Sequence, residues 1–169
     1  MAKIVLRLIK PERYFGDVLK ILKKNKSSSI VYVTTSKPYE TLVSTFAKKG
    51  INLNKILFID CISQQLKEKT KNADNCVFIN SPQNLTAISI AVNEAIRSIS
   101  GKRMLFFDSL SILLIYNDAI TLGKFSNFIL NKMRASDVDM ILLALESDTS
   151  KDIIKQIETI ADVVEGGKR

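Results

Sequence analysis

The feature that most constrains this chain is a regular alternation of short apolar runs with amphipathic stretches of helical period. The runs carry Ile, Val, Leu and Phe at successive positions, as expected for strands that are covered on both faces. They span Lys3–Ile9, Ser29–Thr35, Lys55–Asp60, Cys76–Asn80, Arg103–Asp108, Asp139–Leu145 and Asp162–Glu165. Strands that alternate with helices along a whole chain form parallel sheets with crossover helices. The sequence therefore predicts an α/β fold, a three-layer α/β/α sandwich with a mostly parallel central sheet.

Apolar residues between these runs recur at spacings of three and four, the period of a helix with one buried face. The clearest helix is expected after Ser81-Pro82, a cap residue followed by proline, and Pro38 is predicted to lie in the first turn of another. The stripes are Phe15, Val18, Leu19 and Leu22; Leu42, Phe46 and Ala47; Leu85, Ile88, Val92, Ala95, Ile96 and Ile99; Leu122, Phe125, Ile129 and Met133; and Ile153, Ile154, Ile157 and Ile160. We interpret each stripe as a face turned to the core.

The composition fits one globular domain. Of the 169 residues 46% are hydrophobic, and no linker divides the chain, so residues 1–165 are predicted to form a single domain and 166–169 a flexible tail. The longest apolar stretch, 104–116, is interrupted by Asp108 and Ser109 and is shorter than the ~20 residues that cross a bilayer. No signal peptide is recognisable at the N-terminus. We expect no membrane contact and a cytoplasmic location.

The content of cysteine and histidine excludes several kinds of site. The chain has Cys61 and Cys76 and no His, so neither a zinc site nor a histidine-dependent catalytic triad is expected. The two thiols are predicted to be buried and unpaired, as is usual in a reducing cytoplasm, with a disulfide as the alternative. No metal site and no cofactor are predicted.

The net charge of +8 suggests nucleic acid as one candidate partner, because clustered Lys and Arg release counterions from phosphate backbones. Along the sequence, however, the lysines follow helix ends and loops and are not interleaved with the aromatic residues that stack on bases. They are Lys20, Lys23, Lys24 and Lys26; Lys48 and Lys49; and Lys67, Lys69 and Lys71. We interpret them as solvated surface charge, so nucleic acid is a possible but not favoured partner.

The most informative segment is the apolar strand Arg103–Asp108, which ends in Asp108-Ser109 before a loop. In a parallel sheet this places a carboxylate at the carboxyl edge. P-loop nucleotidases hold the water shell of Mg²⁺ with a carboxylate at that position, because a hard cation prefers oxygen ligands. An Asp at the end of a strand is also common in α/β proteins without a metal.

Several segments occur in an order that resembles a known superfamily. They are Ile30-Val31-Tyr32-Val33-Thr34-Thr35, Ile56-Leu57-Phe58-Ile59-Asp60, Phe106-Phe107-Asp108-Ser109-Leu110-Ser111, the strand Met140–Leu145 and Ala161-Asp162-Val163-Val164-Glu165. This order is similar to that of the RecA/KaiC-like ATPases, particularly their archaeal branches. The resemblance covers about Ser29 to Glu165, and Lys3 to Leu22 more loosely. It implies the P-loop NTPase fold and makes Asp108 and Ser109, as a Walker-B-like remnant, candidate cofactor-binding residues.

The chain departs from that family where the family binds phosphate. After the first strand the family has a glycine-rich loop that ends in Lys and Ser or Thr, and its backbone N–H groups surround the phosphates. Here Lys10-Pro11-Glu12-Arg13 follows the strand and continues as Tyr14-Phe15-Gly16-Asp17. Pro11 has no N–H, and Glu12 brings negative charge to the phosphate position. Lys10 and Arg13 are the candidate anion contacts in this degenerate loop, with solvated charge as the alternative.

A second departure follows the next strand. KaiC-like relatives carry an acidic pair there that activates the attacking water, whereas this chain has Thr35-Ser36-Lys37-Pro38. Glu40 lies inside the predicted helix and is not assigned that role. After the Asp108 strand, Tyr116, Asn117 and Asp118 are candidates for lining a cleft, with a loop and a helix cap as the alternative.

These departures predict a non-catalytic protein of the RecA/KaiC-like fold, not an enzyme, that works in regulation or assembly through contacts with a protein partner or a second copy. Rings of this family depend partly on nucleotide held between subunits, so a monomer or dimer is expected. The first alternative is a ligand- or nucleotide-binding protein that uses the carboxyl edge of the sheet without a standard P-loop. The second is a basic nucleic-acid-binding protein.

Overall fold

The computed structural model describes residues 1–66, 72–149 and 151–167. Seven strands in these ranges form one sheet in which all neighbouring strands are parallel. They are β1 (Ile4–Ile9), β2 (Ser29–Thr34), β3 (Ile56–Asp60), β4 (Cys76–Phe78), β5 (Arg103–Asp108), β6 (Asp139–Leu145) and β7 (Val163–Glu165), in the order β4-β3-β2-β5-β6-β1-β7. The predicted α/β fold is confirmed. The strand boundary that differs most from the prediction is that of β4, which ends at Phe78 rather than Asn80.

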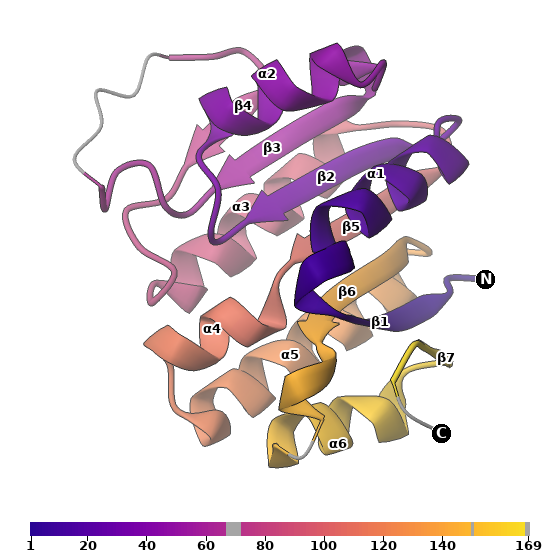
Figure 1. The fold of residues 1–169 in the computed structure, drawn as a ribbon, viewed down its shortest axis with the longest axis vertical. Helices are drawn as coiled ribbons and strands as arrows, with labels where there is room; N and C mark the ends of the chain where they lie inside the picture. Colours follow the sequence, from indigo (N-terminus) through magenta and orange to yellow (C-terminus); the bar gives the residue numbers. More distant parts are fainter. Residues whose placement is uncertain (67–71, 150, 168–169) are drawn as a thin grey trace.

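Helices cover both faces of the sheet (Figure 1). α1 (Tyr14–Lys24) and α2 (Tyr39–Lys48) lie on one face, and α3 (Leu85–Ser98), α4 (Leu110–Tyr116), α5 (Ala119–Ala135) and α6 (Asp152–Ile160) lie on the other. In β2, Ile30 and Tyr32 join the core beneath α1 and α2, whereas Val31 and Val33 join the core on the opposite face. Because both faces are buried, consecutive strand residues are apolar, as the sequence pattern required.

Two helix starts differ from the sequence prediction. The helix predicted after Ser81-Pro82 begins only at Leu85, because the Asn84 side chain accepts a hydrogen bond from the N–H of Ala87 at 3.1 Å and acts as the N-cap. The Ser81 hydroxyl instead accepts from the N–H of Gln83 in the preceding turn. Pro38 lies at the N-cap position of α2, immediately before its first turn rather than within it.

The parallel topology gives the sheet two chemically distinct edges. Each crossover helix runs antiparallel to the strands, so the helices begin near the carboxyl ends of the strands and end near the amino ends. We call these the carboxyl edge and the amino edge. In Figure 1 the heads of β2 and β3 point to the carboxyl edge, at the left of the view. Asp108, at the end of β5, therefore lies at the carboxyl edge, and residues that follow the ends of crossover helices lie at the amino edge.

The cysteines are free thiols rather than a disulfide. Cys61, directly after β3, is buried as predicted, and its burial raises the pKa of the thiol. Cys76 in β4 is only partly buried, although burial still raises the pKa of its thiol to about 12. Both thiols are therefore protonated at neutral pH and poorly nucleophilic.

The predicted tail 166–169 is described only at its first two residues. Gly167 donates its N–H to Oε1 of Glu146 at 3.0 Å, and Gly166 has a φ of 83° and lies so close to β1 that a Cβ atom would collide with the carbonyl oxygen of Leu8. Glycine is required there because the approach leaves no room for a side chain. Residues 168–169 lie outside the described ranges, as do Lys67, Lys69 and Lys71 of the predicted lysine groups. No described helix is long and apolar enough to cross a membrane.

Candidate functional site

The candidate site lies where β5 ends, in the middle of the sheet between β2 and β6. Asp108 is buried and pairs in register with Thr34 of β2. Thr35 donates its N–H and its hydroxyl to the carbonyl oxygen of Asp108, at 2.9 and 3.0 Å, and its hydroxyl oxygen accepts the N–H of Ser109 at 3.0 Å. The peptide bond between Asp108 and Ser109 is cis. The ends of β2 and β5 are thus tied together, which fixes the direction of the Asp108 carboxylate.

Both oxygens of that carboxylate are occupied by tyrosine hydroxyls. Tyr32 of β2 donates to Oδ2 of Asp108 at 2.5 Å, and Tyr14, the first residue of α1, donates to Oδ1. Tyr32 is fully buried, and its ring stacks on Phe106 with the centroids 4.8 Å apart. Each oxygen of Asp108 thus accepts a hydrogen bond from a neutral donor.

The electrostatics of this cluster follow from its burial. Burial raises the pKa of the Asp108 carboxyl above its ordinary value of 3.8, while the hydroxyls of Tyr14 and Tyr32 and the charge of Lys37 oppose that rise. Burial, and secondarily the nearby Asp108 carboxylate, raises the pKa of Tyr14 and of Tyr32 well above 10.0. The tyrosines therefore keep their protons and act only as hydrogen-bond donors.

The connection between β1 and α1 occupies the place of a phosphate-binding loop. Lys10 alone separates β1 from a single 3-10 turn, Pro11–Arg13, which runs directly into α1. Pro11 has no N–H, the N–H of Arg13 donates to the carbonyl of Lys10 at 3.0 Å, and the N–H of Tyr14 donates to the carbonyl of Pro11. The N–H groups of Arg13 and Tyr14 are thus used within the turn and Pro11 has none, so the turn does not offer a triphosphate the convergent N–H groups of a glycine-rich loop.

The structure separates the four residues that the sequence predicts as candidate cofactor contacts. Lys10 and Arg13 are exposed, whereas Asp108 and Ser109 are buried. Ser109 is the N-cap of α4, and its hydroxyl oxygen accepts the N–H of Ile112 at 3.4 Å. This is a structural role. The only one of the four that presents a functional group to the centre of the site is Asp108.

Lys37 lies in the segment after β2 where the family resemblance implies an acidic pair. It follows β2, is partly buried, and its ammonium group lies 4.4 Å from the centre of the Phe15 ring. Glu40 is exposed on α2. The residue beside Asp108 that carries a charge is therefore a cation, which cannot take a proton from a water molecule while charged.

Tyr116, Asn117 and Asp118 form helix ends. Asn117 is the C-cap of α4 and donates its side-chain amide to the carbonyl of Leu113 at 3.0 Å, and Asp118 is the N-cap of α5, accepting the N–H of Thr121 at 2.8 Å. These contacts agree with the capping alternative for Asn117 and Asp118. The Asp118 side chain is exposed, and its hydrogen bonds from Thr121 lower the pKa of its carboxyl.

Sequence reasoning missed Tyr14, Tyr32 and Asp60. A tyrosine inside an otherwise aliphatic strand needs a partner for its hydroxyl, so Tyr32 in Ser29–Thr34 carried a usable signal. Tyr14 carried none. Asp60 ends β3 as Asp108 ends β5, but it accepts from the N–H groups of Tyr39, Ile62 and Ser63 at 2.7, 2.8 and 2.9 Å and from the Ser63 hydroxyl at 2.5 Å. It holds the loop after β3 in place.

The residues of the site do not fit Mg-ATP. The Asp108 carboxylate is buried and each of its oxygens already accepts from a tyrosine hydroxyl, and the β1–α1 turn lacks the N–H groups of a phosphate-binding loop. In the described ranges, no group of three or more His, Cys, Asp and Glu side chains is arranged to hold a metal ion.

Comparisons with known proteins show a family and a fold for this chain. A family model described as "Family of unknown function (DUF7504)" matches residues 20–164. No curated protein matches the sequence. The fold is similar to that of two solved structures: a KaiC-like protein of the hyperthermophilic archaeon Pyrococcus horikoshii (TM-score 0.64, 12% identity, 96% of this chain and 71% of that one) and the flagellar accessory protein FlaH of Methanocaldococcus jannaschii (TM-score 0.64, 13% identity, 96% and 69%). The fold is RecA/KaiC-like.

Proposed function

The chain belongs to the DUF7504 family of unknown function and has a RecA/KaiC-like fold, and from these premises we propose that it is a catalytically inactive module of that fold, acting in regulation or assembly through protein contacts. The observation that carries the proposal is the closed carboxylate. Asp108 is the carboxylate that the RecA/KaiC-like resemblance makes a candidate for cofactor binding, and each of its oxygens accepts a hydrogen bond from a tyrosine, Tyr14 or Tyr32.

Opening this carboxylate to a cation is unfavourable. Two tyrosine hydroxyls would lose their acceptor, and at least Tyr32 would stay buried without a partner, which costs about 1–3 kcal/mol for a neutral polar group. A bound nucleotide would have to supply that free energy without a phosphate cradle at the β1–α1 turn. The architecture therefore favours a closed state that does not turn over ATP.

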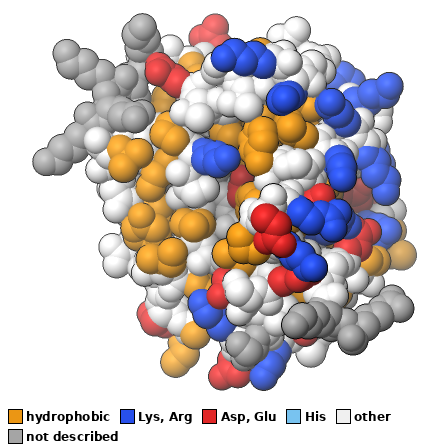
Figure 2. Space-filling view, in the orientation of Figure 1, with side chains coloured by type: hydrophobic (Ala, Val, Ile, Leu, Met, Phe, Trp, Pro, Cys, Tyr) orange, Lys and Arg blue, Asp and Glu red, His pale blue; other side chains and the backbone are white. Residues whose placement is uncertain are grey.

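Protein contacts are supported by exposed apolar side chains. Ile115 of α4 and Ile120 of α5 are each 74% exposed, and Phe128 of α5 is 57% exposed. Figure 2 shows apolar side chains gathered at the left of the view, the side of the carboxyl edge. Large apolar residues that are exposed to solvent are typical of association sites. We define the α4–α5 surface as Ile115, Ile120 and Phe128.

An assay of phosphate release from Mg-ATP tests the absence of catalysis. Wild type, Asp108→Asn and Asp108→Ala are expected to show the same background rate. Asp108→Asn keeps a side-chain oxygen for the tyrosines, so it remains folded where Asp108→Ala is destabilised. Turnover by the wild type that is lost in Asp108→Asn would overturn the proposal.

A test of the contact surface uses matched lysine substitutions. Self-association or partner binding, measured by light scattering or by capture of a cross-linked and identified partner, is expected to be lost in Ile115→Lys and Ile120→Lys. Val77→Lys on the exposed edge strand β4 adds the same charge at the other end of the sheet and is expected to leave association unchanged. Equal loss in all three variants would refute the role of the α4–α5 surface.

A second candidate function has its own observation. A hollow of about 690 Å³ lies at the carboxyl ends of β1 and β6 and is lined by Leu8, Glu146, Lys155, Glu158 and the Gly166–Gly167 turn. Open α/β sheets bind ligands at this edge. Thermal-shift screening with nucleotides and small acids tests this alternative, because a ligand well above its Kd raises the Tm. A shift that Lys155→Gln abolishes would favour ligand binding over the inactive module.

A further inference from the structure

Many of the lysines that are scattered along the sequence lie together at one edge of the folded sheet. Basic side chains crowd the right of Figure 2, the side of the amino edge. Crossover helices end at this edge, so lysines that follow different helices in the sequence become neighbours in space. Lys23 and Lys24 are in the last turn of α1, and Lys48 is in the last turn of α2.

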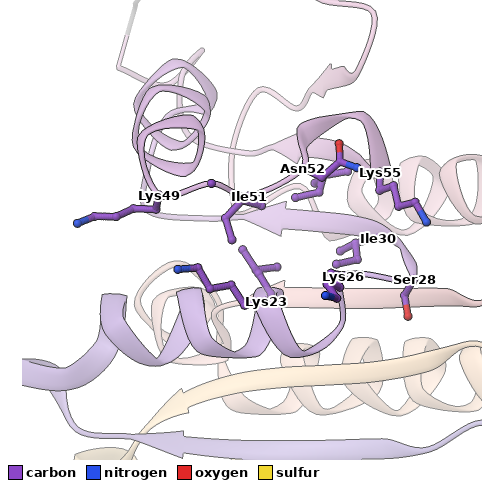
Figure 3. Close-up of a pocket in the computed structure, with 11 residues that line it drawn as sticks. Lys23, Lys26, Ser28, Ile30, Lys49, Ile51, Asn52 and Lys55 are labelled. Carbon is purple, nitrogen blue, oxygen red and sulfur yellow. The ribbon is translucent and has the colours of Figure 1, made fainter.

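A hollow of about 500 Å³ opens in this basic edge, between the ends of α1 and α2 and the beginnings of β2 and β3 (Figure 3). Its lining includes Lys23, Lys26, Lys49 and Lys55, over a floor formed by apolar residues such as Leu22 and Ile56. We call it the lysine hollow. None of its lining residues is acidic, and within the described ranges no carboxylate lies within 4.0 Å of any of the four ammonium groups. The hollow is therefore a concentration of uncompensated positive charge.

Helix stability explains only part of this charge. A lysine at a helix C-terminus is stabilised by the helix dipole, which accounts for Lys23 and for Lys49 at the C-cap of α2. Lys26 lies beyond the end of α1, and Lys55 ends the single 3-10 turn Leu53–Lys55, which is too short to have an appreciable dipole. Like charges brought together in one concave site repel. Lys55 makes one contact, donating its ammonium group to the carbonyl of Ser27 at 3.2 Å. An anionic ligand would remove the repulsion.

The arrangement of the ammonium groups favours an extended anion over a compact one. In Figure 3, Lys49 and Lys55 extend in opposite directions, and Lys23 and Lys26 lie between them. The four charges follow a line across the hollow rather than converging on one point. Ser28 also lines the hollow, and its hydroxyl is the one buried side-chain polar atom without a partner in the described ranges. Its oxygen points away from Lys23 and Lys49, so it does not extend the line of donors.

Basic residues continue beyond the hollow, on the other side of α1. A second hollow of about 320 Å³ is lined by Lys3, Lys20, Lys24 and Lys102, together with Arg7. Three of these five are compensated, because Lys102 lies 3.6 Å from Asp139, Lys20 lies 4.0 Å from Asp17, and Arg7 pairs with Glu165. Lys3 and Lys24 add to the line of positive charge. The surface is thus longer than any single phosphate group.

We propose that the amino edge of the sheet, centred on the lysine hollow, binds the phosphate backbone of double-stranded nucleic acid without reading its sequence. The lining has no aromatic residue, so it offers no platform for unstacked bases, and a duplex, whose bases are already stacked, fits better than a single strand. A membrane surface fits less well, because none of the exposed large hydrophobic residues lines the hollow. The proposal is independent of the inactive-module function, which concerns the opposite edge.

The test is fluorescence anisotropy with a labelled DNA duplex of about 20 base pairs, read as Kd against salt from ~50 to ~200 mM. The test variant is Lys23→Gln/Lys26→Gln/Lys49→Gln. The matched control, Lys10→Gln/Arg13→Gln/Lys124→Gln, removes the same charge from the β1–α1 turn at the carboxyl edge and from α5, where these three residues also have no carboxylate within 4.0 Å in the described ranges. Both variants are first shown to keep the wild-type circular dichroism spectrum and Tm.

We expect the wild type to bind with a log–log salt slope of about −4, because each neutralised phosphate contributes about −0.9. The test variant is expected to bind at least ten-fold more weakly at ~100 mM salt, with a slope smaller by about 3, while the control stays within about two-fold of the wild type. No binding at ~50 mM salt, or equal losses in the two variants, would overturn the proposal. If inorganic tripolyphosphate binds more tightly than the duplex, the hollow is a site for a small polyphosphate. If anionic phospholipid vesicles bind and the duplex does not, the hollow is a membrane-binding site. Either result would overturn the proposal.

Discussion

The two edges of the sheet differ in how their charged groups are satisfied. At the carboxyl edge, Asp108 is buried and its two oxygens accept from Tyr14 and Tyr32. At the amino edge, Lys23, Lys26 and Lys49 surround an open hollow with no carboxylate within reach in the described ranges. The family resemblance implies nucleotide binding at the carboxyl edge, yet the carboxylate there is already hydrogen-bonded within the protein. The amino edge, for which the resemblance implies no role, has the unpaired charges. Polar groups that are hydrogen-bonded to one another stabilise the fold, whereas charged groups without a partner are available to bind a ligand of opposite charge.

The largest effect is expected from removing the carboxylate at the carboxyl edge. Asp108→Ala leaves the hydroxyls of Tyr14 and Tyr32 without an acceptor and is expected to lower the free energy of unfolding by ~3 kcal/mol. Urea denaturation measures this. A loss below about 1 kcal/mol would show that the cluster contributes little to stability and would weaken the contrast between the edges.

Removing one donor at a time is expected to have the next largest effect. Tyr32→Phe leaves one carboxylate oxygen unpaired in the core and is expected to cost ~2 kcal/mol, whereas Tyr14→Phe is expected to cost ~1 kcal/mol, because Tyr14 is only partly buried and water can replace its hydroxyl. Both substitutions keep the ring, so each serves as the control for the other in the same denaturation experiment. A reversed order would indicate that the Tyr14 side of Asp108 is the drier one.

A pH profile sharpens the comparison further. Since burial raises the pKa of the Asp108 carboxyl in the folded state above 3.8, the folded protein holds that proton more tightly than the unfolded chain does. Its contribution to stability is complete below pH 3.8 and is lost as the pH rises through the folded pKa. Asp108→Asn does not titrate, so its free energy of unfolding relative to the wild type should improve from about pH 4 to about pH 7.

The control for that profile is internal. Asp118 and Asp162, whose pKa values hydrogen bonding lowers, contribute with the opposite sign, but they are present in both proteins and cancel in the difference. A difference that does not change with pH would mean that Asp108 titrates alike in the folded and unfolded states.

The smallest effect is expected at the amino edge. Lys26→Gln relieves repulsion in the lysine hollow without removing a charge from a helix end. It is expected to raise the free energy of unfolding by about 0.3 kcal/mol at low salt and to leave it unchanged at high salt. Lys155→Gln on α6 is the matched control. Thermal denaturation of both variants at two salt concentrations measures the difference. A clear destabilisation by Lys26→Gln at both salt concentrations would show that this lysine stabilises the fold and that repulsion in the hollow is negligible.

Much of the fold was readable from the sequence, because strands buried on both faces leave a local signature. The runs around Val31, Phe58 and Phe106 predicted the strands, and the stripe that contains Ile88 and Ile96 predicted α3. The residues that directly follow Ile9 likewise show, without any knowledge of the fold, that no glycine-rich loop follows the first strand. Helix starts were less certain, since Ser81 and Asn84 are both capable N-caps and the sequence alone does not choose between them.

The sequence by itself determined that this chain forms a parallel α/β sheet with a strand ending in Asp108 and no standard phosphate loop. Only the tertiary structure decided what surrounds that aspartate, because Tyr14 and Tyr32 are 94 and 76 residues away along the chain and meet it only when α1, β2 and β5 pack together. The same is true of the lysines, which are separate in sequence and adjacent in space because parallel topology brings helix ends to one edge. Periodicity is a local property of a chain, whereas a site is made of residues that only folding brings together.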